Sequence, residues 1–184
     1  IKRSLSLLVP GSTAVVIGAG GLGHMAIQIL QALTPATIVA GDQRQEALDL
    51  ATDVGAHHGV RSGDDAADEI RDITGGDGAE LVLDLVGADA TLALAAEVVH
   101  VLGHLTIVGI GGGTLAVGFF SVPYEAAVAT TYWGSVTELM EVIALAERGM
   151  IEAHVTTVGL DDAAGVYDRL RNGDIRGRAV IVPN

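Results

Sequence analysis

The chain has 184 residues, a formal net charge of −13 from 23 acidic and 10 basic residues, and no cysteine. A surface this acidic repels nucleic acid and anionic lipid, so we expect neither nucleic acid nor a membrane as a partner. The missing cysteine excludes disulfides, thiolate metal sites and thiol catalysis within this chain. No apolar run reaches the roughly 18 residues of a spanning helix, and we find no signal peptide, so we expect a soluble cytoplasmic protein.

Apolar, β-branched runs alternate with helical patterns from residue 13 to residue 110. Continuous apolar runs predict buried strands at 13–18, 36–42, 79–87 and 104–110, with a short strand at 57–60. Apolar residues at helical spacing predict helices at 21–33, 44–55, 64–76 and 89–103. Because right-handed helical crossovers join parallel strands, this order predicts a Rossmann-type, doubly wound α/β fold with a parallel sheet.

The pattern changes after residue 110. Two strand-like pieces around Pro123, within 111–135, are expected to add edge strands, and a helix follows at 136–149. The remaining segment predicts a strand at 154–158, a helix at 161–172 and a strand at 178–182. We therefore divide the chain into one domain at 1–149 and a C-terminal tail at 150–184.

Glycines at 18, 20, 21 and 23 stand where the first strand gives way to the first helix. In the pattern G-x-G-x-x-G, Gly18 permits a tight turn, Gly20 lets a pyrophosphate approach the backbone, and Gly23 lets the helix pack close to the strand. The N–H groups of Gly21 and Leu22 are expected to point at the phosphates from the helix N-terminus. The pattern alone is weak evidence, but its place between a strand and a helix indicates a dinucleotide site rather than a simple glycine turn.

An acidic residue, Asp42, ends the second predicted strand. A carboxylate there accepts hydrogen bonds from both ribose hydroxyls of NAD and repels the extra phosphate of NADP, although Arg44 lies close enough to weaken that preference. A methyltransferase that uses an adenosyl cofactor also has a glycine loop and an acid after the second strand. That fold usually carries another acid before its glycines, where this chain has Val15, Val16 and Ile17, so we favour NAD.

Six segments in order resemble the cofactor domain and tail of medium-chain zinc alcohol dehydrogenases: GSTAVVIGAGGLGHMAIQIL, ATDVGA, TGGDGAELVLDLVG, LTIVGI, TTYWGSVTELMEVIALAERG and IRGRAVIVP. Bacterial NAD-dependent secondary-alcohol dehydrogenases are the most similar. The resemblance covers nearly the whole chain. It implies an NAD-binding Rossmann domain over 1–149 and a tail that, in the family, returns to the catalytic domain.

The resemblance also implies roles for single residues. Val108, Gly109 and Ile110 match the backbone that holds the nicotinamide carboxamide, and we place Val86 among the cofactor-binding residues. Tyr132 and Trp133 match the wall of the substrate pocket beside the nicotinamide, where Trp133 also meets the cofactor. Arg178 matches an arginine that pairs with the pyrophosphate. Without the resemblance, Trp133 suggests core packing and Arg178 a solvated charge.

The family's chemistry resides on a GroES-like catalytic domain, with zinc ligands and a proton relay, that has no counterpart in this chain. We therefore assign no catalytic residue and no metal ligand, and expect the chain alone to be inactive. His57 and His58 are adjacent and point to opposite faces of a strand, and Gly103 separates His100 from His104, so neither pair suggests a metal site. Asp84 is expected to bond a neighbouring loop rather than act as a catalytic acid.

Three functions remain open. The first is the cofactor half of a zinc-dependent, NAD-dependent alcohol dehydrogenase, which positions NAD(H) for hydride transfer to or from a secondary alcohol or ketone. The second is a free-standing NAD(H)-binding regulatory module, and the third is the zinc-free quinone-reductase branch, which uses NADPH. The TTYWGS motif and Asp42 favour the first. We also expect a homodimer through the apolar 111–135 edge, and a tail that is mobile, repacked or docked on another chain.

Overall fold

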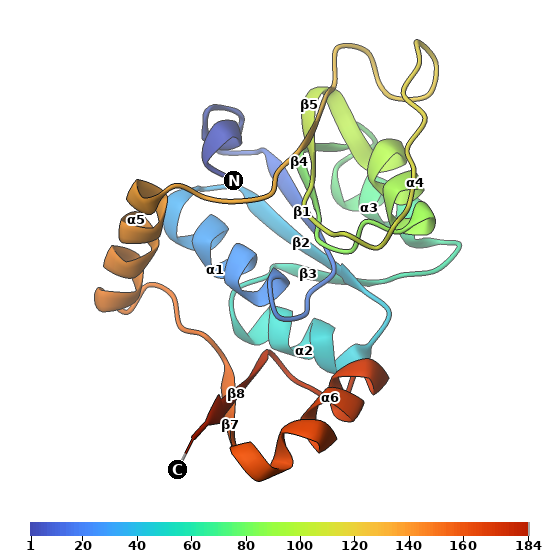
Figure 1. Ribbon diagram of the computed structural model, residues 1–184. Coiled ribbons are helices and arrows are strands. Elements are labelled where there is room, and N and C mark those ends of the chain that lie inside the picture. Colours follow the sequence, from blue (N-terminus) through green and yellow to red (C-terminus); the bar gives the residue numbers. More distant parts are fainter. Residues whose placement is uncertain (184) are drawn as a thin grey trace.

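A computed structural model describes residues 1–183 as an open six-stranded sheet with helices on both faces (Figure 1). The strands run parallel in the order β3-β2-β1-β4-β5-β6. They are β1 (Thr13–Ile17), β2 (Thr37–Asp42), β3 (His58–Arg61), β4 (Ala79–Asp84), β5 (Val99–Ile107) and β6 (Ala127–Thr130). This is the predicted Rossmann-type sheet. Its order reverses between β1 and β4, the switch point at which such sheets bind ligands beyond the strands' carboxyl ends.

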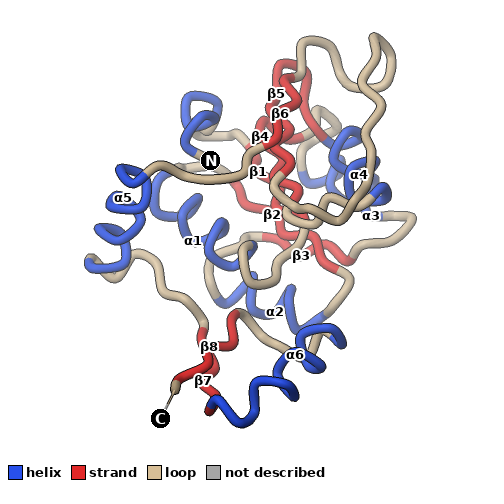
Figure 2. The backbone as a smooth tube through the Cα atoms, in the orientation of Figure 1, coloured by secondary structure: helices blue, strands red, loops and turns tan. Residues whose placement is uncertain are grey.

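Alternate residues of β1 divide the apolar core into two layers. Ala14 and Val16 pack in one cluster with residues of α1 (Gly23–Leu33) and α2 (Gln45–Asp53). Val15 and Ile17 pack in the other cluster with residues of α3 (Ala66–Ile73) and α4 (Asp89–Val98). Figure 2 shows these two helix pairs on opposite sides of the strands. An uninterrupted apolar strand therefore forms here because both of its faces are covered.

The boundary between α4 and β5 differs from the sequence prediction. The helix predicted at 89–103 is wrong beyond Val98, because β5 begins at Val99. The β4–β5 register shifts between Ala79 and Leu81, which pair with Val99 and His104. An irregular segment between those two partners contains Leu102 in the left-handed region, at φ +64°. β-branched valines and this bulge favour a strand over a longer helix.

The strands predicted at 79–87 and 104–110 also end early, at Asp84 and Ile107. The residues beyond both ends form the loops of the candidate site described below. Of the two pieces expected within 111–135, the described residues form only β6, at the edge of the sheet. Three consecutive glycines at 111–113 and Pro123 interrupt strand pairing in the rest of that segment.

Helix α5 (Val136–Glu147) follows β6 and begins with a reciprocal cap. Ser135 Oγ accepts the N–H of Glu138, and the Glu138 carboxylate accepts the N–H of Ser135. At the other end of the chain, a short 3₁₀ helix, η1 (Lys2–Leu7), precedes β1. No helix in residues 1–183 combines the length and the apolar character that crossing a membrane requires.

The tail forms a separate unit of secondary structure. It contains β7 (Val155–Gly159), the 3₁₀ helix η2 (Leu160–Asp162), α6 (Ala163–Asn172) and β8 (Arg178–Val182). β7 and β8 make their own two-stranded parallel sheet. Gln28 exchanges two hydrogen bonds with the Glu152 backbone, at 2.9 and 2.8 Å, and Arg176 pairs with Asp53. These contacts hold the tail against α1 and α2, in the lower part of Figure 1.

Candidate functional site

The glycine loop between β1 and α1 has the turn and the close contact that its sequence predicts. Gly18 has φ +91°, a backbone conformation that residues other than glycine rarely adopt. A Cβ added to Gly23 would lie 2.1 Å from the carbonyl oxygen of Gly18. The helix therefore starts directly on the end of the strand, with no room for a side chain between them.

The N-terminus of α1 presents free backbone donors. Its N-cap residue is Leu22, which supplies no side-chain hydrogen bond. Within residues 1–183, the N–H groups of Gly21 and Leu22 have no hydrogen-bond acceptor. These donors and the positive end of the helix dipole suit an anionic group.

Asp42 is held at the edge of the glycine loop. Its Oδ2 accepts the N–H of Ala19 at 2.9 Å, and its Oδ1 accepts the N–H of Arg44 at 3.0 Å. The Arg44 Nε lies 3.4 Å from the same Oδ1, and the Asp42 side chain is only 10% exposed. The carboxylate is therefore fixed at the carboxyl end of β2, against the loop that follows β1.

A cavity of about 270 Å³ opens beside this carboxylate. It lies at the carboxyl ends of β1 and β2, and Val86, from the loop after β4, forms one wall. Its lining residues are Ile17, Gly18, Gly41, Asp42, Gln43, Arg44, Ser62, Val86 and Thr91.

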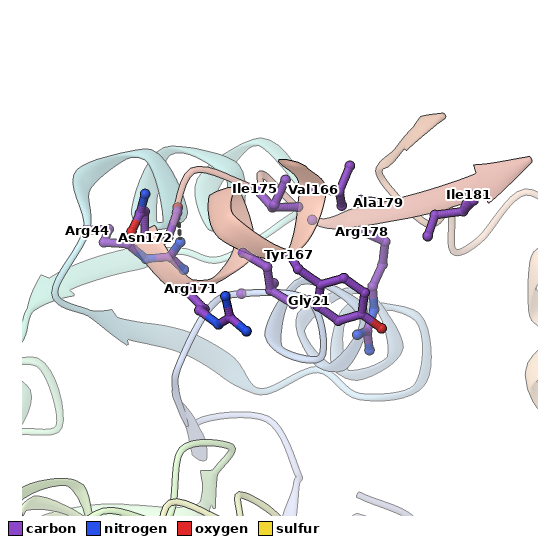
Figure 3. A pocket seen from close by; sticks show the side chains of 14 residues that line it. Gly21, Arg44, Val166, Tyr167, Arg171, Asn172, Ile175, Arg178, Ala179 and Ile181 are labelled. Atoms are coloured by element: carbon purple, nitrogen blue, oxygen red, sulfur yellow. Dashed lines mark hydrogen bonds between the residues drawn. The ribbon is translucent and has the colours of Figure 1, made fainter. Parts of the chain in front are cut away.

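A larger cavity, of about 510 Å³, lies between the glycine loop and the tail (Figure 3). Arg44, Arg171 and Arg178 all line it, although the protein carries a net charge of −13. A Cβ added to Gly21 would lie 3.0 Å from the Arg178 Cζ, so this guanidinium lies directly against the glycine loop. Arginines around free backbone N–H groups form a site for a phosphate or pyrophosphate.

The tail helix is tied to the same cavity through Arg44. Arg44 Nη1 donates to the carbonyl of Gly173, the C-cap of α6, at 2.7 Å. Tyr167, Arg171 and Gly173 also line this cavity, although the sequence did not predict them as site residues. Two arginines in the last turn of α6 were the available signal, but no motif connects that turn to the glycine loop.

Asp84 has the structural role expected of it. Its side chain is fully buried, and Oδ1 accepts the N–H groups of Val86 and Gly87 at 2.8 and 2.9 Å. Oδ2 accepts the Thr91 hydroxyl at 2.9 Å. The carboxylate thus fixes the loop after β4 and the start of α4.

The loops after β4 and β5 are joined by backbone contacts. The N–H groups of Val108 and Gly109 both donate to the carbonyl of Asp84, at 2.8 and 3.0 Å. A Cβ on Gly109 would fall 2.1 Å from the Val86 backbone. Val86 and residues 108–110 therefore lie at the same edge of the sheet as the glycine turn, although the Ile110 side chain is 90% exposed.

Tyr132 and Trp133 lie apart from these cavities. Their rings meet edge to face with centroids 4.5 Å apart, and the side chains are 77% and 79% exposed. They belong to the loop between β6 and α5. The structure thus brings together the glycine loop, Asp42, Arg44, Val86 and Arg178, and leaves these two aromatic residues in solvent.

The described residues do not form a set of side chains that could bind zinc. The chain has no cysteine, and within residues 1–183 no three His, Asp or Glu side chains gather at metal-binding distance. His57 accepts the N–H of Ile38 through Nδ1 instead, at 2.9 Å.

Comparisons with known proteins agree with this arrangement. Residues 21–148 match the protein family described as zinc-binding dehydrogenase. An NAD-dependent alcohol dehydrogenase of Sulfurisphaera tokodaii is 38% identical over 96% of this chain and 52% of its own length. A D-arabinose 1-dehydrogenase (NADP(+)) of Saccharolobus solfataricus is 32% identical over 100% of this chain and 53% of its own length.

Solved structures give the same relationship. The crystal structure of the alcohol dehydrogenase from Aeropyrum pernix superposes with a TM-score of 0.92 at 35% identity, over 99% of this chain and 53% of that one. The chain therefore spans about half the length of the relatives it matches. The matched family, the sheet order and the glycine loop together show that this chain belongs to the medium-chain, zinc-binding alcohol dehydrogenase family, as its cofactor-binding domain.

Proposed function

We propose that this chain binds NAD(H) as the cofactor half of a zinc-dependent alcohol dehydrogenase. One observation carries the proposal. The free N–H groups at the N-terminus of α1, the guanidinium of Arg178 and the fixed carboxylate of Asp42 all lie around the same glycine loop. Pyrophosphate and ribose present the complementary groups in the same order.

The dinucleotide would lie across this edge. Gly20, Gly21, Leu22 and Gly23 would receive the pyrophosphate, which has room there because neither Gly20 nor Gly21 carries a Cβ. Arg178 would add a charge-assisted hydrogen bond from above. The turn at Gly18 sets the direction of the loop. Asp42 would accept hydrogen bonds from the ribose hydroxyls.

The nicotinamide half would extend past β4 and β5. The Asp84 carbonyl already accepts the N–H groups of Val108 and Gly109, which leaves the carbonyl oxygens of this segment and the backbone of Ile110 to hold the carboxamide. Tyr132 and Trp133 would face a small secondary alcohol or ketone once the substrate site is complete. When bound, the nicotinamide supplies hydride transfer, and the share of this chain is to orient it.

Zinc would come with residues outside this chain. We expect the 184-residue chain alone to bind the cofactor and to show negligible dehydrogenase activity. We further propose a cytoplasmic homodimer joined through the 111–135 edge, because β6 is an edge strand, and Phe119 and Phe120, in the segment before it, are 75% and 88% exposed.

Use of NADP is the second candidate. Arg44 pairs with Asp42, so its guanidinium lies where it can offset the repulsion between that carboxylate and a ribose phosphate. This contact favours a modest rather than an absolute preference for NAD. A free-standing regulatory module remains the alternative if no catalytic partner exists.

Amide chemical shifts of the isotope-labelled chain, recorded during titration with NADH, test the location of the site. We expect the largest changes at Gly20 to Gly23, Asp42 and Arg178, and none at α3. Changes confined to other segments, with binding intact, would contradict the proposed site.

A further inference from the structure

A buried histidine connects the glycine loop to the tail. His24, the second residue of α1, is fully buried. Its Nδ1 lies 3.0 Å from the carbonyl oxygen of Gly20, and its Nε2 lies 3.2 Å from the backbone nitrogen of His154. One imidazole ring therefore bridges two segments that are far apart in the chain.

The two partners fix the protonation state of this ring. The backbone N–H of His154 can only donate, so Nε2 must be an unprotonated acceptor. The Gly20 carbonyl can only accept, so Nδ1 must carry the proton. Both contacts are therefore satisfied only by the neutral ring with its hydrogen on Nδ1, because a charged ring would turn an N–H toward the N–H of His154.

The first contact sets the orientation of a peptide plane. The Gly20 carbonyl also accepts the backbone N–H of His24, at 3.1 Å, so two donors hold it. The chain contains no cis peptide among its described residues. In a trans peptide the C=O and N–H point in opposite directions, so holding the Gly20 oxygen toward His24 turns the N–H of Gly21 away from that ring. Arg178 lies against the same glycine, because a Cβ added to Gly21 would be 3.0 Å from the Arg178 Cζ.

The second contact sets the position of that arginine. The carbonyl of His154, the residue whose N–H His24 accepts, takes the backbone N–H of Arg178 at 2.8 Å. Val155 then pairs with Arg178 at the start of the β7–β8 sheet. A Cβ on Gly177 would lie 2.3 Å from the His154 oxygen, so the two segments are in close contact.

The surroundings of His24 keep it uncharged. Burial lowers the pKa of His24, and the charges of Arg178 and His154 lower it further, while the bond to the Gly20 carbonyl acts in the opposite direction. Arg178 and His154 are the charged and titratable groups that act on the ring, and both come from the tail. From the glycine loop, the backbone carbonyl of Gly20 acts on the ring.

We propose that His24 is a positioning residue for the cofactor: as the neutral Nδ1–H tautomer, it sets the Gly21 N–H and the Arg178 guanidinium against the same phosphate. This inference rests on the proposed NAD(H) site. His24 does not touch the phosphate itself and acts through the loop on one side and the tail strand on the other.

A double-mutant cycle tests the proposal. The affinities for NADH and for adenosine are measured at neutral pH for the wild-type chain, H24N, R178Q and the double variant. Asparagine can still reach the Gly20 carbonyl but not His154, so H24N releases the tail alone. We expect H24N to weaken NADH binding about tenfold, by misplacing one charge-assisted contact, and to leave adenosine binding unchanged.

The losses of NADH affinity caused by H24N and R178Q should not be additive. If His24 acts through Arg178, the double variant binds NADH about as weakly as R178Q alone. H58N, which alters an exposed histidine on β3, is the matched control and should bind like wild type. Additive losses, or unchanged NADH affinity in a folded H24N variant, overturn the inference. Failure of the wild-type chain itself to bind NADH contradicts the proposed function instead.

Nitrogen-15 chemical shifts of the wild-type histidine rings test the tautomer without any variant. At neutral pH the His24 ring should give a protonated Nδ1 and an unprotonated Nε2, with or without NADH. A ring protonated on Nε2, or on both nitrogens, would overturn the assignment even if NADH binds.

Discussion

Asp42 is the residue that connects this structure most directly to cofactor choice. Oδ2 accepts the N–H of Ala19 and keeps a free lone pair for a ribose hydroxyl, whereas Oδ1 accepts both the backbone N–H and the Nε of Arg44. The side chain is therefore oriented before a ligand arrives, which lowers the entropic cost of binding.

Substitution of Asp42 by serine should weaken NADH binding and relax the preference over NADPH. Hydrogen bonds to a charged group contribute about 1.5–3 kcal/mol, so we expect about a tenfold to hundredfold loss for NADH. NADPH should lose less, because the substitution also removes the repulsion and frees Arg44. Titrations of D42S, with D64S at an exposed loop position as the control for charge, measure both effects. If D42S leaves the preference for NADH over NADPH unchanged, Asp42 does not determine cofactor choice.

His24 predicts a pH dependence of stability. Because burial lowers its pKa in the folded state, the unfolded chain takes up its proton first as the pH falls. The contribution of His24 to the free energy of unfolding is thus fully present above about pH 6.5, the unperturbed value, and decreases below it, down to the lowered pKa.

Urea unfolding at several pH values between neutral and mildly acidic measures this decrease. We expect wild type to lose stability more steeply than H24N, while H58N follows wild type. Parallel curves for wild type and H24N would show that His24 does not titrate differently in the two states.

The contact between α1 and β1 determines how a glycine-to-alanine substitution in the loop affects stability. A Cβ on Gly23 would lie 2.1 Å from the Gly18 oxygen, whereas one on Gly165, within α6, would meet no atom within 4 Å. Alanine normally stabilises a helix by about 0.5–1 kcal/mol relative to glycine. The two positions thus separate helix propensity from helix–strand packing.

G23A should destabilise the fold by about 1–3 kcal/mol, because α1 must move away from β1. G165A should stabilise the chain slightly or leave it unchanged. The midpoints of urea unfolding compare the two variants with wild type. Equal effects at both positions would contradict the close packing of α1 on β1.

Much of the sheet could be predicted from apolar patterning, but the boundary at Val98 could not. The run from Ala95 to Val101 fits a helix as well as a strand. Pairing with β4, and a bulge that places Leu102 in the left-handed region, decide between them, and neither feature has a local signal.

The candidate site, too, was predictable from the sequence only in part. The strand–glycine–helix pattern predicts the loop, and the end of β2 predicts the position of Asp42. The contacts of His24 with His154 and of Arg44 with Gly173 join segments more than 100 residues apart. They depend on how the tail folds back, which no motif in the sequence specifies.

At the scale of the whole molecule, β3 and β6 are the two edge strands of the six-stranded sheet, and β6 belongs to the segment proposed for dimerisation. The N–H of Thr131 donates to Ile107 of β5 at 3.0 Å. Since successive N–H groups of a strand point to opposite sides, the N–H of Thr130 points outward. A second copy of the chain could add its own edge strand there.

T130P should therefore convert a dimer into a folded monomer, because proline removes the outward donor and is tolerated at an edge. T131P is the contrasting variant and should weaken the β5–β6 contact itself. Sedimentation equilibrium gives the mass of each form. A wild-type chain that is already monomeric, or a T130P dimer, would contradict dimerisation through this edge.

We propose above all that the glycine loop and Asp42 together bind NAD(H). Calorimetric titration of the 184-residue chain with NADH and with NADPH is the first experiment to make. We predict one site per chain and tighter binding of NADH than of NADPH. Binding of neither cofactor, or equal affinity for both, would contradict it.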